Sequence, residues 1–170
     1  MYQKAWKHLN NIGPIESDCG TLCNHACCKG TADDGMLLFP GEEEMYSGGG
    51  DWYTIRDSNI LLPKGTAIKL FVCNGRCKRD MRPLSCRIFP IVPYIDDFDY
   101  LEFIPDLRGV AVCPLLYRSD AYEISLIFID ALYSAFSTLI EDERVLEFIE
   151  ILSKQHDEIA EDFQQFLGPD

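Results

Sequence analysis

The sequence predicts an α+β fold, in which a small, irregular, cysteine-rich β region is followed by a C-terminal antiparallel helical hairpin. Two patterns indicate this. Short apolar runs separated by turn residues occupy the first two thirds of the chain, and a helical apolar period begins after Ser119. The length of 170 residues is that of one domain, 1–170. Within it we expect a metal-binding, cysteine-rich part at about 15–115 and the hairpin at about 119–168.

The N-terminal part predicts two short helices. The first spans 2–12 and ends at Gly13-Pro14. The second would carry Cys19, Cys23 and Cys27 on one face, since they are spaced by four residues. Ser17 or Asp18 would cap it, and Lys29-Gly30 would close it. Cys28 is expected to point elsewhere, because adjacent side chains diverge.

The middle of the chain predicts strands that deliver the remaining cysteines. The expected strands are 36–39, 52–55, 59–62, 67–72, 91–95 and 100–104, with a helical start at 40–46. The strand at 67–72 leads into Cys73, and the Asn-Gly pair before Cys77 predicts a tight knuckle. A short helix beginning at Pro83 would carry Cys86 and end at Pro90, and an apolar segment at 109–113 delivers Cys113.

The last third predicts two consecutive helices. Residues 120–140 are apolar on most sides, which indicates a largely buried helix. A second helix opens at 141–143, carries an amphipathic stripe and stops at Gly168-Pro169.

Composition and charge restrict the possible partners. The net charge of −13 disfavours non-specific binding to nucleic acid and to anionic membranes, since both would repel such a surface. The N-terminus lacks the apolar core of a secretory signal, and the apolar run at 124–129 is too short to span a bilayer. We therefore expect a soluble, cytoplasmic protein.

Eight cysteines are the main functional signal. In a reducing compartment, clustered cysteines are more often metal ligands or redox groups than disulfides. The candidate metal ligands are Cys19, Cys23, Cys27, Cys28, Cys73, Cys77, Cys86 and Cys113. We therefore expect a metal ion as partner. A protein partner and a small-molecule substrate are not defined by the sequence.

Eight thiols suit several arrangements. They could form two tetrahedral zinc sites, one or more iron–sulfur clusters, or one four-cysteine site with spare thiols. Zinc is the first expectation, because thiolate sites that fold loop-rich regions most often hold zinc. The alternatives are an iron–sulfur or iron-dependent enzyme for redox or methyl-transfer chemistry, and a protein-interaction module with a structural metal. The divergence expected at Cys27 and Cys28 favours two centres or a polynuclear one.

Basic residues surround the downstream cysteines between Lys64 and Arg87. Arg82 and Arg87 flank Cys86 and are candidates for hydrogen bonds to sulfur or to an anionic ligand. The same basic residues, which include Arg76, would equally suit pairing with the acidic C-terminal helix. His25 lies within the first cysteine group, where a polar surface role is favoured over a ligand role.

The cysteine pattern resembles a known family. Cys19-x3-Cys23-x3-Cys27-Cys28, then Cys73-x3-Cys77, Arg82-Pro-Leu-Ser-Cys86-Arg-Ile-Phe-Pro90 and Cys113-Pro114 are similar to the family described as zinc- or iron-chelating, with a CxxCxxCC signature. The first group departs from that spacing by additional residues, and the helical tail lies outside the resemblance. A similar cysteine region occurs in flagellin lysine N-methylases, which use S-adenosylmethionine. No pocket for that cofactor is recognisable in the sequence, so the resemblance implies metal chelation only.

Overall fold

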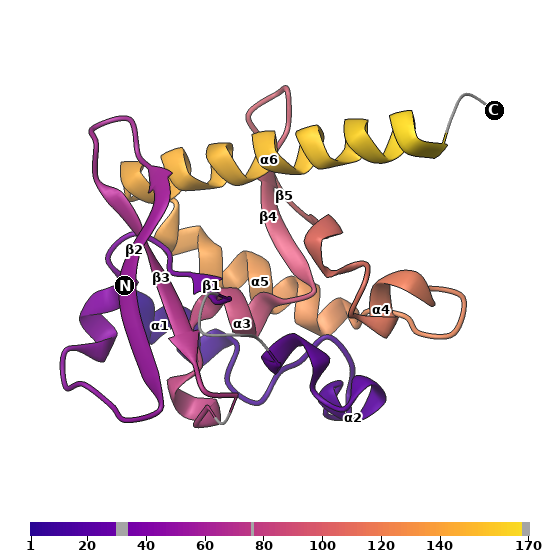
Figure 1. Cartoon of the computed structure of the whole chain (residues 1–170), viewed down its shortest axis with the longest axis horizontal. Coiled ribbons are helices and arrows are strands. Elements are labelled where there is room, and N and C mark those ends of the chain that lie inside the picture. The colour runs from indigo at the N-terminus through magenta and orange to yellow at the C-terminus, as the bar shows by residue number, and fades with distance from the viewer. Residues whose placement is uncertain (30–33, 76, 168–170) are drawn as a thin grey trace.

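The computed structural model describes residues 1–29, 34–75 and 77–167, and it confirms the α+β class (Figure 1). Gly30, Arg76 and the helix stop at Gly168-Pro169, which the sequence analysis singled out, lie outside the described residues. The α-helices are α1 (Tyr2–His8), α2 (Gly20–Cys23), α3 (Leu84–Ile88), α4 (Pro114–Tyr117), α5 (Leu126–Leu139) and α6 (Glu143–Leu167). The 3-10 helices are η1 (Ala26–Cys28), η2 (Glu42–Tyr46), η3 (Arg79–Met81) and η4 (Leu107–Gly109).

Two small antiparallel sheets make up the β structure. The strands are β1 (Met36–Leu37), β2 (Tyr53–Leu61), β3 (Ala67–Cys73), β4 (Ile91–Ile95) and β5 (Leu101–Pro105). The first sheet has the order β1-β3-β2, and β4 and β5 form the second. In the first sheet Tyr53 pairs with Cys73, so the last residue of β3 is held in register at the sheet end.

The prediction of separate strands at 52–55 and 59–62 was wrong, because β2 is continuous. The polar residues between them do not form a turn. Asp57 faces Lys69 across the sheet and forms an ion pair with it. The register shifts between Asp57 and Leu61, and Ser58 Oγ accepts a hydrogen bond from Ile60 N over 3.1 Å in this bulge. A solvent-facing cross-strand pair therefore explains the polar run.

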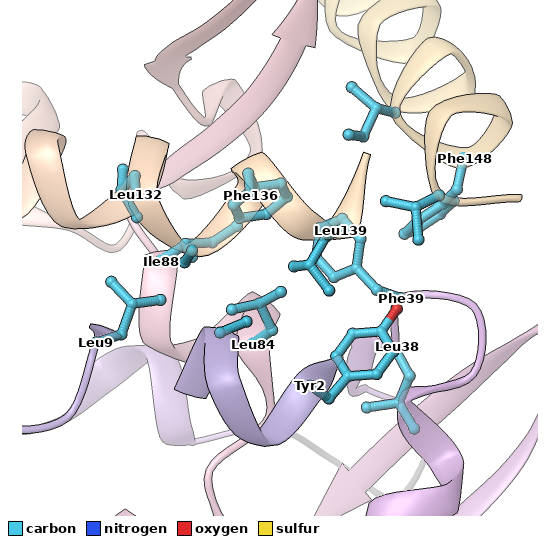
Figure 2. Close-up of a cluster of buried hydrophobic side chains, with 14 of the residues drawn as sticks. Tyr2, Leu9, Leu38, Phe39, Leu84, Ile88, Leu132, Phe136, Leu139 and Phe148 are labelled. Atoms are coloured by element: carbon cyan, nitrogen blue, oxygen red, sulfur yellow. The ribbon is translucent and has the colours of Figure 1, made fainter. Parts of the chain in front are cut away.

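The core lies between α1, α3, α5 and the start of α6 (Figure 2). Phe39 is fully buried in it, with edge-on ring contacts to Phe136 at 5.3 Å and to Phe148 at 5.2 Å between centroids. Figure 2 shows Leu84 and Ile88 of α3 reaching toward the same cluster. The short helix that carries Cys86 is thereby fixed on the core.

The two C-terminal helices are consecutive, but their main packing partners lie elsewhere. α5 packs chiefly against α1, and α6 packs chiefly against β4. Ser153 of α6 accepts a hydrogen bond from Ile95 N over 2.8 Å, which ties the helix to the end of β4. The two helices therefore follow one another as expected for the C-terminal hairpin, and each packs chiefly on another element of the fold. Figure 1 shows α6 crossing β4 on the side of the molecule away from α2.

The start of α5 also differs from the prediction of about 119–120. Residues 118–122 form a turn in which Ala121 N donates to Arg118 O over 2.9 Å. Ser125 has extended backbone and precedes the first helical residue, Leu126. Ile124 belongs to the partly buried residues packed on the core, although it precedes the helix.

Within the described part of the chain, neither the long apolar α5 nor the polar α6 has the length and hydropathy of a membrane-spanning helix, and the other helices are shorter still.

Candidate metal centre

The candidate ligands come from separate segments of the chain, and the structure leaves all eight as free thiols. Cys113 is buried, Cys27 is exposed and the others are half-buried. The segments are α2 with η1, the end of β3 with the following turn, α3, and the residue before α4.

The predicted single helix through Cys19, Cys23 and Cys27 was wrong. α2 ends at Cys23, and Asn24 and His25 both adopt left-handed backbone angles, with φ of 51° and 55°. Asn and His enter this region more readily than most residues, so the break is compatible with the sequence. The three thiols therefore do not share one helix face, and the chain turns before η1 carries Cys27 and Cys28.

Gly20 permits this turn. The imidazole of His25 folds back against it, so that a Cβ at Gly20 would lie 2.2 Å from His25 Nδ1. The backbone N–H of His25 donates to Gly20 O over 2.8 Å. A residue with a side chain at Gly20 would displace the ring, so the close approach depends on glycine.

The side chains of Cys27 and Cys28 do not diverge as expected. Their thiols hydrogen-bond to one another, with Cys28 acting as donor, which lowers the pKa of Cys27 and raises that of Cys28.

The turn after β3 lies against Cys28. Asn74 N donates to Trp52 O over 2.9 Å, which holds the chain at the sheet end. Gly75 has a φ of +78°, and a Cβ there would lie 2.9 Å from Cys28 O. The predicted knuckle between Cys73 and Cys77 therefore depends on a glycine at the point where it contacts the first cysteine segment.

Cys86 joins these thiols from α3. Its pKa is raised by burial in the first place, and Cys73, Cys28 and Cys77 act electrostatically in the same direction. Cys28, Cys73 and Cys77 also line one hollow. We call Cys28, Cys73, Cys77 and Cys86 the four-thiol group.

Cys113 belongs with the first segment instead. Its electrostatic neighbour is Cys23, and Cys19 is influenced by both Cys113 and Cys23. We call Cys19, Cys23 and Cys113 the three-thiol group. The backbone N–H groups of Leu115 and Leu116, at the start of α4, donate toward the Cys113 sulfur. They lower its pKa, although burial, the larger effect, leaves it raised overall.

Cys27 connects the two groups. It hydrogen-bonds to Cys28 of the four-thiol group and also interacts electrostatically with Cys23, Cys19 and Cys86. The structure thus brings all eight predicted ligands into two neighbouring groups joined through Cys27.

Arg82 lies where the two groups meet. Its guanidinium hydrogen-bonds to Cys77 and acts electrostatically on Cys86 and Cys28, and it also lowers the pKa of Cys19. Burial works to lower the pKa of Arg82, but these sulfur neighbours outweigh it and the pKa is raised. The structure is therefore consistent with a hydrogen bond from Arg82 to a ligand sulfur.

Arg87 has a different position from the one predicted. It donates from Nε to Arg82 O over 2.6 Å and from Nη2 to Asp80 O over 2.7 Å. Its guanidinium also stacks 4.7 Å from the centre of the Trp6 ring. These contacts hold the loop that carries Arg82.

The donor set suits a thiophilic ion in its chemistry. Four thiolates are the ligand set of many zinc and iron–sulfur sites, and N–H groups and a guanidinium near sulfur favour the thiolate form. Among residues 1–29, 34–75 and 77–167, no three Cys, His, Asp or Glu side chains stand close enough together to hold an ion without further movement. An ion would have to draw the sulfurs inward to bonds of about 2.3 Å.

Sequence reasoning missed two supports of the thiols, Gly20 and Glu42, whereas Gly75 belongs to the Asn-Gly pair that it used. Gly20 lies inside the first cysteine segment, where a glycine between closely spaced cysteines is a usable signal. Glu42, which fixes the start of α3, gave no such signal, because it stands in a run of three acids.

Comparison with known proteins adds no relative. The chain matches no family model, no curated protein and no solved structure.

Proposed function

We propose that this chain is a metal-binding protein whose cysteine thiolates chelate zinc. The observation that carries the proposal is that free cysteines from segments far apart in the sequence form two neighbouring groups, and that Arg82 acts on Cys19, Cys28, Cys77 and Cys86 among them. Thiols that had only a packing role would have no reason to gather around a cation.

Zinc is the first choice because of the kind of structure that surrounds the thiols. They lie on short helices, sheet ends and turns rather than on long elements. Such regions bury little apolar surface, and a structural zinc ion supplies the missing folding free energy. In a reducing cytoplasm, where we expect the protein to act, the thiols would remain available for the ion.

We further propose two adjacent four-thiolate sites. The four-thiol group supplies one complete ligand set. The three-thiol group is completed by Cys27, whose electrostatic neighbours include Cys19 and Cys23. Adjacent residues Cys27 and Cys28 would then serve different ions, which places the two sites next to each other.

Arg82 offsets the charge of such sites. Four thiolates around a divalent zinc ion leave a net negative charge, and a neighbouring cation lowers the cost of assembling it. Arg82 contacts the four-thiol group directly and reaches Cys19 electrostatically, so one guanidinium serves both sites.

The test is anaerobic purification followed by metal analysis, thiol titration and a visible spectrum. The expected result is a colourless protein with two equivalents of zinc and thiols that react only after chelation. A brown protein containing iron and sulfide would replace zinc with an iron–sulfur cluster on the same ligands. Folded, metal-free protein in which every thiol reacts freely would overturn metal binding altogether.

A further inference from the structure

A cavity of about 480 Å³ lies beside the four-thiol group. Its wall includes Cys28, Cys73, Cys77 and Cys86 at one side and reaches Phe148 and Leu152 of α6 at the other. The metal proposal uses only the thiol side, so the rest of this space has no assigned role. A volume of this size falls within the range of small-molecule sites.

The wall away from the thiols is apolar. Phe39, Phe71 and Phe89 contribute rings, and Val92 and Leu152 contribute aliphatic side chains. Several of these belong to the core, so the inner wall is held rigidly by packing. An elongated apolar body would fill this part with favourable burial of its surface.

The charged residues among the described part of the wall are Lys29, Asp34, Arg82, Asp106 and Arg108. They differ in the hydrogen bonds that they can offer a ligand. Asp106 accepts from Arg108 Nε and Nη2, both over 2.8 Å, so these two charges neutralise each other. Arg82 lies at the thiol side and bonds a cysteine sulfur rather than a carboxylate. A guanidinium presents five N–H donors in a plane, and one thiol occupies only part of them.

From this geometry we infer that the cavity binds an organic carboxylate with an elongated apolar body. The carboxylate would lie at Arg82, where paired N–H groups match its two oxygens. The apolar body would extend between Phe89, Val92 and Leu152 toward α6. An ammonium group cannot replace the carboxylate in these hydrogen bonds, because an ammonium and a guanidinium both carry donors only.

The inference rests on the proposed function in one respect, since the ligand head would lie against the proposed metal site. Metal content and ligand binding are therefore measured on the same preparation. Zinc-loaded protein that binds no carboxylate would overturn the inference and leave the metal proposal intact. Folded protein that contains no metal but binds the carboxylate would overturn the metal proposal and leave the inference intact.

Decanoate, kept below its micelle concentration, is the probe, and decanol and decylamine are the neutral and cationic controls. Calorimetric titration of the metal-loaded full chain is expected to show one decanoate site, with decanol at least about tenfold weaker and decylamine weaker still. Equal affinity for decanoate, decanol and decylamine would show that Arg82 does not discriminate between head groups, and would overturn the inference.

Two pairs of variants, each a test variant with a control, locate the site. Leu152→Phe would fill the apolar end and weaken decanoate and decanol alike, whereas Ile151→Phe, one residue away on α6 and not on the cavity wall, would leave both unchanged. Arg82→Gln would weaken the binding of decanoate and leave that of decanol unchanged, whereas Arg79→Gln would change neither. If Arg82→Gln fails to fold, the Leu152 and Ile151 pair still decides: equal decanoate binding by both variants would place the ligand elsewhere and overturn the inference.

Discussion

The indole N–H of Trp6 donates to Glu42 Oε1 over 2.8 Å, in a part of the molecule where the carboxylate is fully buried. The same oxygen accepts from Leu84 N over 2.6 Å, and Oε2 accepts from Phe39 N over 3.3 Å. One carboxylate thus joins α1, the chain after β1 and the first residue of α3. Because α3 carries Cys86, this link connects the core with the four-thiol group.

Stability should fall as pH rises through the titration of Glu42. Burial raises its pKa from 4.5 to about 7, although its hydrogen bonds work in the opposite direction. The folded chain therefore holds a proton more tightly than the unfolded chain. The stabilisation from this group is complete below pH 4.5 and is lost as pH rises to about 7, a difference of roughly 3 kcal/mol in the free energy of unfolding.

Urea unfolding at pH 5 and pH 8 tests this expectation. Glu42→Gln should cost about 1 kcal/mol at pH 5, because the amide places a donor opposite Phe39 N. The variant should lose less stability than the natural chain between the two pH values. Glu44→Gln, an exposed position in the same short helix, is the control and should keep the natural pH dependence. A parallel pH dependence in Glu42→Gln would show that this carboxylate does not titrate in the range.

Alanine at Gly75 should disturb the four-thiol group. The residue would be strained at φ +78°, and its Cβ would lie 2.9 Å from Cys28 O. Gly65 provides a matched control, since its φ is +83° and nothing stands within 4 Å of a Cβ there. Both substitutions should cost about 1 kcal/mol from the backbone angle, and Gly75→Ala should cost more and lower metal content. Equal melting shifts with unchanged metal would contradict the contact between the knuckle and Cys28.

Removal of Arg87, a buried charged residue, should destabilise the chain. Arg87→Gln would lose the bonds to Arg82 O and Asp80 O together with the stacking on Trp6. The expected loss is about 2–3 kcal/mol in the free energy of unfolding, measured by urea titration. Lys78→Gln, an exposed cation in the same loop, should change stability by less than about 0.5 kcal/mol. A similarly small loss of unfolding free energy in Arg87→Gln and Lys78→Gln would mean that the loop holds Arg82 in place without the bonds from Arg87.

Single cysteine substitutions should separate the two proposed sites. Cys86→Ser should remove one metal equivalent and leave the site built on the three-thiol group, and Cys113→Ser should remove the other. Cys27→Ser should resemble Cys113→Ser, and Cys28→Ser should resemble Cys86→Ser. Loss of all metal from every variant would indicate one polynuclear centre in place of two sites.

The sequence predicted the elements with strong local patterns. The strands at 91–95 and 100–104, the helix after Pro83 and the position of Cys73 at a strand end all agree with the structure. The continuous strand β2 was missed because Asp57 and Ser58 look like turn residues, and only the facing Lys69 shows their role. The packing of α6 on β4 depends on contacts such as Ser153 with Ile95, which have no local signal.

The candidate site also has features that the sequence predicted and features that it did not. The eight cysteines were predicted by residue type and spacing, but the predicted helix through the first three failed at Asn24 and His25. A period of four residues indicates a shared face only where the backbone stays helical, and two left-handed residues cancel it. Cys113 is distant in sequence from Cys19 and Cys23, so their association could be recognised only from the tertiary structure.

The separation of the thiols along the chain has a consequence for how an ion would act on folding. An ion held by Cys28, Cys73, Cys77 and Cys86 would close a long loop of the unfolded chain, much as a disulfide does, and would stabilise the fold chiefly by restricting that chain. Removal of the ion by an added chelator would then lower the free energy of unfolding of the whole chain, although the core around Phe39 keeps its contacts. Amide hydrogen exchange after chelation should therefore quicken first in η1 and in the turn after β3, and only later in α5.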